Sequence, residues 1–388
     1  MRILFDLISS QPVANRGVVF HGGGEFTRRV FIELVIVNSS ADIEAVYNQK
    51  NTLDEYVLEL CQQKGIVLHP VGSRKDFARL LGEKHYDKFF MGMYEPEYDC
   101  EIPRDTQVLL YKHDTRSKDR IFQRYVWHYE PTCLRRLFAR TLLPMYAVIR
   151  NMVRHYKDIK FTKMLLRADR VFTVSNFSRY ELVQWYKLSL DKVTVFYPPL
   201  KQLNIQDEIK KDYSIPDKKF FLLVSCNRYV KNAYMAVHAF DELFDEFSLD
   251  EYCVVCCGKL PPTIYADIKH KDRFILRGYL EEQELDALYK NAHAFIYPTL
   301  FEGFGYPPLE AMRHGTPVLA SAVTAVTEVC GQAVLYFNPY SLPEIKNRIL
   351  FAAFENLDVY RQLGLERYNE IKEKQAKDLS ELVGTILT

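Results

Sequence analysis

Short apolar runs alternate with amphipathic stretches along the whole chain. One such run, from Ala294 to Tyr297, is followed by two glycines and a helical stretch that Gly315 and Pro317 are placed to end. Apolar runs of about four to eight residues between helical stretches are typical of buried strands in parallel sheets. The same pattern predicts strands over residues 2–8, 66–69, 88–91, 107–111, 168–174, 192–197, 219–225, 252–258 and 273–276. We therefore predict an α/β protein built from doubly wound parallel sheets.

The length of the chain and one pause in this pattern predict two domains. A chain of 388 residues is too long for one typical hydrophobic core. The alternation pauses near residue 200, where Pro198 and Pro199 stiffen the chain, and then begins again. We expect two Rossmann-like domains, residues 1–200 and 201–365, followed by a helix over residues 366–388.

The composition argues against several functional classes. A net charge of +1 does not suit a general nucleic-acid binder, which would carry a basic excess over a whole domain. The apolar run at the start is too short for a signal peptide, and no run reaches the ~18 apolar residues of a membrane span. We therefore expect a cytoplasmic protein. Cys253 and Cys256 form the one C-x-x-C pair, and their place in a buried strand argues against zinc or redox chemistry.

The turn that follows Tyr297 has the chemistry of a phosphate site. Gly303 and Gly305 let the backbone turn tightly, and Pro307 or Pro308 suits the first turn of the helix that follows. The start of that helix is expected to present backbone N–H groups and the positive end of the helix dipole. Both features favour a phosphate as the ligand.

Two carboxylates frame this turn, Glu302 at its start and Glu310 about one helical turn into the helix. Carboxylates repel a phosphate, so beside a phosphate site they make sense chiefly as acceptors for the hydroxyls of a sugar or ribose. A sugar nucleotide offers both groups. The residues alone leave an equally good alternative, in which Glu310 is a glutamate favoured by the helix dipole and Glu302 is a solvated loop residue.

The stretch that starts at Glu302 reads E-G-F-G-Y-P-P-L-E and continues A-M-R-H-G-T-P-V-L-A-S. It resembles the E-x7-E signature of the retaining GT-B glycosyltransferases of family 4, also called glycosyltransferase group 1. The segments A-D-R-V-F-T-V-S-N-F-S-R after Arg167 and G-Y-L-E-E-Q-E-L-D-A-L-Y from Gly278 also resemble that family. The resemblance implies two domains that face each other across a cleft, the first binding an acceptor and the second a nucleotide sugar. It also implies that the C-terminal helix returns to the first domain.

The same resemblance implies roles for individual residues. It assigns catalysis to His113, Arg228, Lys231 and Glu302. It assigns donor binding to Gly23, Gly24, Gly303, Phe304, Gly305 and Glu310. Glu302 is then expected to hold the donor sugar, Glu310 the ribose, and Lys231 the pyrophosphate. His113 is expected beside the transferring sugar, and the glycines at 23 and 24 in a loop that closes over the phosphates. Arg228 departs from the pattern, because it lies three residues before Lys231 and not about five.

The reaction that the resemblance implies is the transfer of a hexose with retention of configuration. The donor is expected to be GDP-mannose or a UDP-hexose, and the acceptor a hydroxyl of a glycan or lipid-linked saccharide in bacterial surface polysaccharide synthesis. The chain has no D-x-D motif, which favours a reaction without a metal or other cofactor. Two alternatives are a sugar-nucleotide epimerase or hydrolase on the same fold, and a non-catalytic scaffold at a membrane surface.

The segment from residue 134 to 170 is strongly basic, with ten lysines and arginines against two aspartates. Apolar residues are interleaved with these charges, as in an amphipathic helix that lies on an anionic lipid surface. The arginines proposed for that surface are Arg135, Arg136, Arg140, Arg150 and Arg154. The alternative is a solvated helix that covers the first domain, and Pro144 interrupts either helix. The expected partners are a nucleotide sugar, a glycan or lipid-linked acceptor and an anionic membrane at its inner face, but no nucleic acid.

Overall fold

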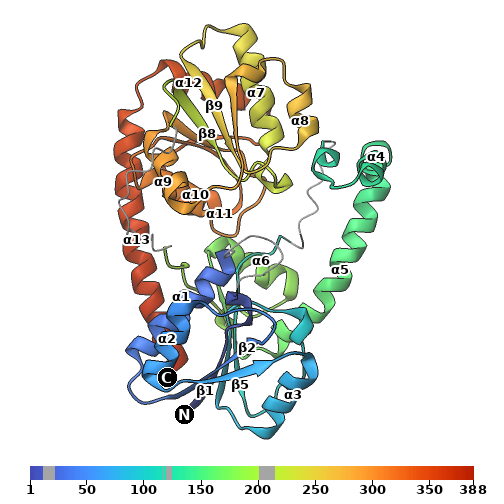
Figure 1. Ribbon diagram of the computed structural model, residues 1–388, viewed down its shortest axis with the longest axis vertical. Helices are drawn as coiled ribbons and strands as arrows, with labels where there is room; N and C mark the ends of the chain where they lie inside the picture. Colours follow the sequence, from blue (N-terminus) through green and yellow to red (C-terminus); the bar gives the residue numbers. More distant parts are fainter. Residues whose placement is uncertain (12–21, 117, 119–124, 201–214) are drawn as a thin grey trace. The chain divides into compact units, whose positions relative to one another are not determined.

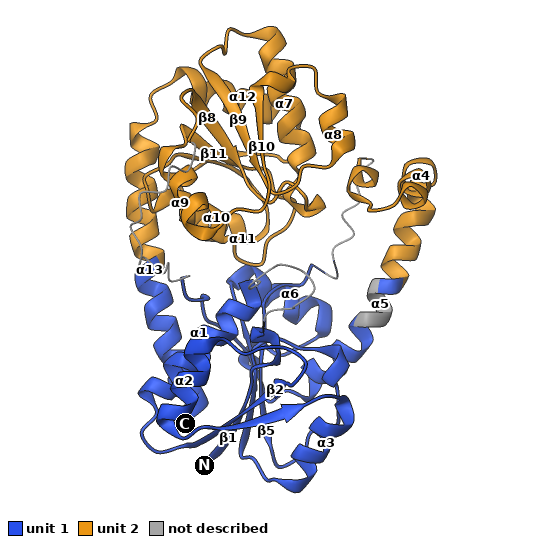
Figure 2. Ribbon diagram, viewed as in Figure 1, with its two compact units in different colours: residues 1–118, 153–201, 372–388 blue, residues 119–152, 202–371 orange. Residues whose placement is uncertain are grey.

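The computed structural model describes residues 1–11, 22–116, 118, 125–200 and 215–388 (Figure 1). They form two compact units: residues 1–118, 153–201 and 372–388 make up unit 1, and residues 119–152 and 202–371 make up unit 2 (Figure 2). The sequence predicted an uninterrupted first domain over residues 1–200, whereas the structure places residues 119–152 in unit 2. The reason is packing, because Tyr125 stacks on Tyr234 with ring centroids 4.4 Å apart.

Unit 1 is built on a parallel sheet whose strand order in the described residues is β3-β2-β1-β4-β5-β6-β7. Its strands are β1 (Arg2–Asp6), β2 (Asp42–Asn48), β3 (Val67–Val71), β4 (Lys88–Met91), β5 (Gln107–Lys112), β6 (Arg170–Thr173) and β7 (Val193–Val195). The helices between them are η1 (Ile8–Ser10), α1 (Gly22–Val37), α2 (Glu55–Lys64), α3 (Arg74–Glu83), η2 (Pro96–Tyr98), α6 (Asn176–Tyr186) and η4 (Leu190–Lys192). Phe31 of α1 packs on Phe5 on one face of the sheet, and Leu182 of α6 packs with Leu4 on the other.

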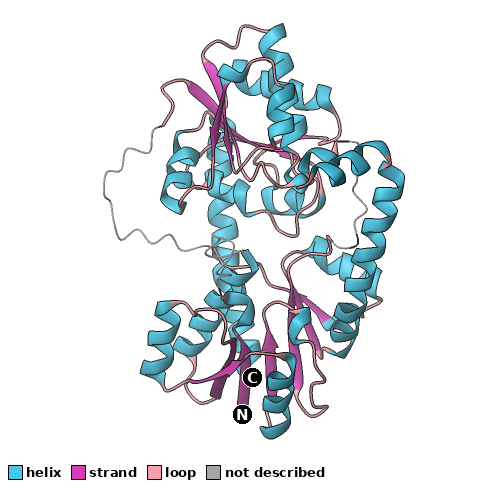
Figure 3. Cartoon of the chain, turned by 45° about the vertical axis from the view of Figure 1, so that its right-hand side comes forward, coloured by secondary structure: helices cyan, strands magenta, loops and turns pink. Residues whose placement is uncertain are grey.

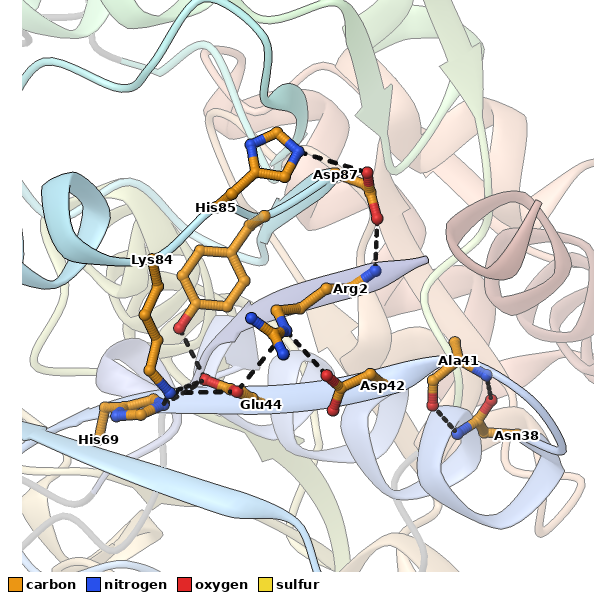
Figure 4. Close-up of polar contacts among 10 residues, drawn as sticks. Arg2, Asn38, Ala41, Asp42, Glu44, His69, Lys84, His85 and Asp87 are labelled. Atoms are coloured by element: carbon orange, nitrogen blue, oxygen red, sulfur yellow. Dashed lines mark hydrogen bonds and ion pairs between the residues drawn. The ribbon is translucent and has the colours of Figure 1, made fainter.

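Strand β2 was missed in the sequence because a charged residue interrupts its apolar run. Glu44 lies in the middle of β2 and is nevertheless buried. Its carboxylate accepts hydrogen bonds from Lys84 Nζ at 2.9 Å and Tyr86 Oη at 2.7 Å, and His69 Nε2 lies 2.5 Å away (Figure 4). Burial acts to raise the pKa of Glu44, but these partners together lower it to about 2. A buried charge with this many partners is compatible with a strand.

Unit 2 is built on a second parallel sheet, with strand order β10-β9-β8-β11-β12-β13 in the described residues. Figure 3 colours the strands magenta. Its strands are β8 (Lys219–Leu223), β9 (Tyr252–Cys257), β10 (Phe274–Arg277), β11 (Ala294–Tyr297), β12 (Val318–Ser321) and β13 (Leu335–Phe337). The helices between them are η5 (Tyr229–Lys231), α7 (Ala233–Glu246), α8 (Pro262–Asp267), η6 (Lys271–Arg273), α9 (Glu282–Asn291), α10 (Tyr306–Met312), α11 (Thr324–Cys330) and α12 (Leu342–Phe354). The main core of this unit lies between the sheet and α7, α8 and α12.

The basic segment forms η3 (Val126–Tyr129), α4 (Cys133–Thr141) and α5 (Leu143–Arg167). Pro144 is the second residue of α5, where a proline costs no hydrogen bond, so it separates two helices as predicted. Thr132 caps α4 by accepting a hydrogen bond from the backbone of Arg135 at 3.3 Å. None of the helices in the described ranges is long and apolar enough to cross a membrane.

The last helix, α13 (Asp358–Leu387), runs from unit 2 into unit 1, as predicted. Within unit 1 the carboxylate of Asp378 accepts a hydrogen bond from the backbone N–H of Tyr197 at 2.7 Å. Lys88 Nζ donates to the carbonyl of Ile386 at 3.2 Å, which satisfies one of the last carbonyls of the helix. The end of the chain is therefore an integral part of unit 1.

Candidate active site

In unit 2 the predicted strand, turn and helix are present around residues 294–315. Strand β11 has the predicted bounds and is buried, and α10 begins at Tyr306. Gly305 precedes this helix with a φ of +109°, a conformation that favours glycine. The strand order reverses between β8 and β11, and ligands of open α/β sheets bind beyond the carboxyl ends of the strands at such a reversal. A ligand of unit 2 is therefore expected at the loops after β8 and β11.

An ion pair joins these two loops. Lys231 Nζ, which follows β8, donates a hydrogen bond of 2.7 Å to Glu302 Oε1, which follows β11. The lysine side chain is 6% exposed and the glutamate side chain 17%. Lys231 Nζ also donates to Tyr297 Oη at 2.9 Å, and Thr299 Oγ1 donates to Glu302 Oε1 at 2.8 Å. The two sequence-predicted residues are thus brought together at the switch point of unit 2.

The surroundings keep this glutamate ionised. Burial acts to raise the pKa of Glu302, but the ammonium group of Lys231 and hydrogen bonds from Lys231 and Thr299 lower it below its usual value. Burial and the nearby carboxylate of Glu302 raise the pKa of Tyr297 well above its usual value. At neutral pH Glu302 is therefore a hydrogen-bond acceptor and not an acid.

Backbone contacts fix the two loops to each other. The carbonyl of Val230 accepts a hydrogen bond from Leu300 N at 2.8 Å and lies 3.1 Å from Thr299 Oγ1. The backbone N–H of Glu302 donates to Thr324 Oγ1 at 3.1 Å. Thr324 has a φ of +49°, which is rare for a β-branched residue and is typical of strained functional sites.

Asn232, the neighbour of Lys231, anchors the same loop. It has a φ of +57°, and its amide group donates to the carbonyl of Pro339 at 3.0 Å. Its side-chain oxygen accepts a hydrogen bond of 2.6 Å from Tyr125 Oη. Both partners, the Pro339 carbonyl and the Tyr125 hydroxyl, come from segments far away in the sequence, so the position of Lys231 depends on the docking of residues 125–129.

The other predicted residues of unit 2 lie on the same two loops and on α10. Gly303, Phe304 and Gly305 are buried in the turn before α10. Arg228 is exposed on the loop after β8, three residues before Lys231. Glu310 is half-buried on α10, and burial and this carboxylate raise the pKa of Tyr289 well above its usual value.

The remaining predicted residues lie in unit 1. His113 directly follows β5, at the carboxyl end of that strand as predicted, and its Nε2 lies 3.0 Å from the carbonyl of Gly92. Because a carbonyl oxygen only accepts, His113 carries a proton on Nε2. A Cβ atom added to Gly23 would lie 3.4 Å from the His113 ring and 3.0 Å from Met93 Sδ. The structure therefore brings Gly23 and His113 together.

The glycine-rich segment needs one correction. The sequence predicted a loop at Gly23 and Gly24, whereas both residues lie in the first turn of α1. Thr27 Oγ1 donates to the carbonyl of Gly23 at 2.9 Å, one turn earlier in this helix. Glycine disfavours a helix interior, but at the first turn this cost is small because the N–H groups there have no intrahelical acceptor.

Several partners of the ion pair were not predicted. Tyr297, Thr299 and Thr324 contact Lys231 or Glu302, and only the closeness of Thr299 to Glu302 in the sequence offered a signal. Thr324 belongs to another strand–helix connection and could not be linked to Glu302 without the fold. Among the described residues no three His, Cys, Asp or Glu side chains come together as the ligands of a metal ion.

Residues 205–363 match the model of a family described as "Glycosyl transferases group 1". The chain carries a domain of the group 1 glycosyl transferase family. This domain contains Arg228, Lys231, Glu302 and Glu310, so the predicted family is confirmed for the part of the chain that holds the ion pair.

Curated relatives match the chain over part of their length. The serotype-specific mannosyltransferase WbdA of Escherichia coli is 30% identical over 213 residues, which is 51% of this chain and 26% of WbdA. The O-antigen chain mannosyltransferase RfbU of Salmonella typhimurium is 31% identical over 181 residues, which is 45% of this chain and 48% of RfbU. The matched region therefore spans about a quarter of one relative and about half of the other.

Solved structures match the whole chain at the level of the fold. A glycosyltransferase from Rickettsia africae has a TM-score of 0.62 at 14% identity and covers 100% of this chain, with 98% of its own length matched. WaaG, a glycosyltransferase involved in lipopolysaccharide biosynthesis, has a TM-score of 0.61 at 12% identity, with 99% of each chain covered. These likenesses confirm the predicted GT-B fold of two doubly wound domains.

Proposed function

We propose that the protein is a glycosyltransferase that moves a hexose from a nucleoside-diphosphate sugar to a hydroxyl group. The observation that carries this proposal is the Lys231–Glu302 pair, held 2.7 Å apart at the switch point of a group 1 glycosyl transferase domain. A cation and an ionised carboxylate in one place match the two halves of the donor. The ammonium group of Lys231 can bind the diphosphate, and the carboxylate of Glu302 can accept hydrogen bonds from the sugar hydroxyls.

The chemistry assigned to unit 2 is stabilisation of the leaving group. Charge develops on the departing nucleoside diphosphate, and a preorganised cation lowers the barrier most where that charge appears. Lys231 is fixed by Glu302 and Tyr297, so it does not need to reorganise during the reaction. Arg228, exposed on the same loop, is the second cation, and its guanidinium group matches the geometry of a phosphate. We propose that these groups replace a metal ion and that no cofactor takes part.

We propose that the sugar is transferred with retention of its anomeric configuration. In that reaction the acceptor hydroxyl attacks on the face from which the diphosphate leaves, and its proton passes to the diphosphate. Glu302 then acts as a hydrogen-bond acceptor for the sugar and forms no covalent bond with it. The low pKa of Glu302 supports this role, because an ionised carboxylate is the better acceptor.

The substrates belong to the same proposal. WbdA and RfbU are described as mannosyltransferases, which favours GDP-mannose as the donor, with a UDP-hexose as the second choice. RfbU is described as acting on an O-antigen chain, which favours a glycan or lipid-linked saccharide as the acceptor and a role in bacterial surface polysaccharide synthesis. We propose that the enzyme acts in the cytoplasm, at the inner face of the cell membrane.

A transfer assay tests this proposal. The purified chain is incubated with GDP-mannose or UDP-hexoses, a panel of oligosaccharide and lipid-linked acceptors, and EDTA, and the products are separated by chromatography. We expect one donor to yield a glycosylated acceptor and a free nucleoside diphosphate, with the α-configuration of the donor kept in the product. Release of free sugar or of an isomerised sugar nucleotide in place of transfer would indicate a hydrolase or an epimerase.

A further inference from the structure

The helices α4 and α5 are labelled in Figure 1. They expose apolar side chains where a surface helix normally exposes polar ones. In the part of these helices that belongs to unit 2, Leu134 is 82% exposed and Met152 is 67% exposed. The exposed large apolar residues of this part are Leu134, Leu137, Leu142, Met145, Val148, Ile149 and Met152. We name these seven residues the α4–α5 apolar surface.

The spacing of these residues places them on one side of each helix. In α5 the positions 145, 148, 149 and 152 follow the i, i+3, i+4, i+7 pattern of a single stripe. In α4 Leu134 and Leu137 are neighbours on one face, one helical turn apart. Apolar residues scattered singly over a surface are normal, whereas a contiguous exposed stripe marks a surface that binds a protein or a membrane.

The opposite side of each helix is the side that packs on unit 2. In α4 the buried residue is Ala139, which joins Val126 of η3 in a small core. In the unit 2 part of α5 the side chain of Tyr146 is buried, and its hydroxyl donates to the carboxylate of Glu130. Arg150, one turn after Tyr146, donates to Glu130 Oε1 at 2.6 Å. In the unit 2 part of α5, Tyr146 and Arg150 thus contact the protein, whereas the apolar stripe from Met145 to Met152 is exposed.

The charge of the segment indicates what covers this surface. Residues 131–157 contain six lysines and arginines and no aspartate or glutamate. Arg135 and Arg140 are exposed on α4 beside the apolar surface, and the Arg140 guanidinium also lies 5.0 Å from the centroid of the Trp127 ring. Arg136 and Arg150, by contrast, donate to the backbone or carboxylate of Glu130, so they serve the fold. The side chain of Arg154 lies outside the described residues.

We propose that the α4–α5 apolar surface binds an anionic lipid membrane, with its leucines and methionines in the interface and Arg135 and Arg140 among the headgroups. This inference rests on the proposed function in one respect, since a lipid-linked acceptor requires the enzyme at a membrane. Apolar side chains flanked by cations suit such an interface. A second copy of the chain is the less favourable occupant, because it would bring the same positive charges together without any acidic residue from this segment to offset them.

The chain offers a built-in reporter for the test. Cys133, at the start of α4, is the exposed one among the eight cysteines, all of which are described. An environment-sensitive fluorophore on Cys133 is mixed with vesicles of phosphatidylcholine alone or with phosphatidylglycerol added, and binding is also measured by vesicle sedimentation. We expect a blue shift and sedimentation with the phosphatidylglycerol vesicles, and weaker effects with phosphatidylcholine alone.

Matched variants locate the binding surface. The surface variant carries Leu134→Gln, Leu137→Gln, Met145→Gln and Met152→Gln, and its control carries Phe354→Gln and Val359→Gln, which are also exposed in unit 2. The charge variant carries Arg135→Gln and Arg140→Gln, and its control carries the exposed Lys271→Gln and Lys290→Gln. We expect vesicle affinity to fall at least about tenfold in the surface and charge variants and to stay within about twofold in both controls.

Two results would overturn the proposal. One is vesicle binding that is unchanged in the surface variant. The other is a parent protein that binds no vesicles but self-associates, with self-association lost in the surface variant, because a second copy would then be the occupant. Failure of the proposed function is distinguishable, because Lys231→Ala is expected to abolish transfer without changing vesicle binding. The surface variant is expected to keep transfer to a water-soluble acceptor.

Discussion

Lys231 Nζ and Glu302 Oε1 lie 2.7 Å apart, and the two residues come from the loops after β8 and β11, which are 71 positions apart in the sequence. The pair is largely screened from water, and Tyr297 and Thr299 complete its hydrogen bonds. A buried pair of this kind adds little net stability but is costly to break on one side only. Its location at the switch point gives the group 1 glycosyl transferase domain a fixed cation and a fixed anion.

Removal of either charge is expected to abolish most of the turnover. Lys231→Ala and Glu302→Ala should each lower the transfer rate by at least about 100-fold, because each removes charge stabilisation at the donor. Initial rates at saturating donor measure this effect. Lys219→Ala is the control, since Lys219 forms an exposed ion pair with Glu251 in the same unit. Near-normal rates in both site variants would disprove the assigned roles.

The Lys231–Glu302 pair is also expected to affect the free energy of unfolding. Each single alanine variant should lower the free energy of unfolding by about 3–5 kcal/mol, because one buried charge is left without its partner. Lys231→Ala combined with Glu302→Ala should cost less than the sum of the single variants, because no unpaired charge remains buried. Urea unfolding of the four proteins gives the coupling between the two residues. Additive losses would mean that the two charges do not depend on each other.

Gly23 and Gly22 differ in what a methyl group would contact. In Gly23→Ala the new Cβ would lie 3.0 Å from Met93 Sδ and 3.4 Å from the His113 ring, whereas in Gly22→Ala nothing lies within 4 Å. We expect Gly23→Ala to displace His113 and lower the transfer rate. Gly22→Ala should keep the rate and change the stability of α1 little, because Gly22 is the first residue of this helix. Equal rates in the two variants would show that the closeness of Gly23 and His113 has no role in transfer.

The buried carboxyl group of Asp6 makes the stability of unit 1 fall as the pH rises. Burial raises the pKa of Asp6 to about 8, with Glu95 adding to the effect against a hydrogen bond from the backbone of Ile8. The native state therefore holds a proton that the unfolded state releases near its ordinary pKa of about 4. Stability is full below that value and is lost as the pH rises through about 8.

This prediction is tested with Asp6→Asn, which cannot ionise. The variant should lose less stability than the parent between about pH 5 and pH 9 in urea unfolding. Asp191→Asn is the control, since Asp191 is exposed at the surface of unit 1. Parallel pH profiles for the parent and Asp6→Asn would contradict the predicted shift.

The contribution of Glu44 to stability depends on pH in the opposite direction to that of Asp6. Its pKa of about 2 lies below the usual value, so its contribution to stability is present above about pH 4.5 and is lost as the pH falls through 2. Glu44→Gln should cost unit 1 about 1.5–3 kcal/mol, because Lys84 and Tyr86 lose a charged acceptor. Thermal unfolding near neutral pH measures this loss, with the exposed Glu83→Gln as the control. A variant as stable as the parent would show that the cluster in Figure 4 is not stabilising.

Most of the fold could be predicted from the sequence because parallel sheets bury their strands on both faces. The strands at residues 88–91 and 294–297 have the predicted bounds, since their apolar runs end sharply at polar or glycine-containing turns. Strand β2 was missed because Glu44 interrupts its run, and only the three-dimensional contacts with Lys84, His69 and Tyr86 make that charge acceptable in a strand.

The candidate site could be predicted only where its residues belong to a local motif. Glu302 and Lys231 each follow a buried strand, which made them visible in the sequence. Thr324 was not visible, because its contact with Glu302 depends on how two strand–helix connections pack. The assignment of residues 119–152 to unit 2 was missed for a similar reason, since it depends on Tyr125 docking against Asn232 and Tyr234.

The donor site is tested most directly by calorimetric titration of the purified chain with UDP, GDP, ADP and TDP in the presence of EDTA, for the parent and for Lys231→Ala. We predict that one nucleoside diphosphate binds selectively and that Lys231→Ala weakens its affinity by at least about tenfold. If none of the four binds, or if the variant binds as tightly as the parent, the Lys231–Glu302 pair is not a donor site and the proposed function is wrong.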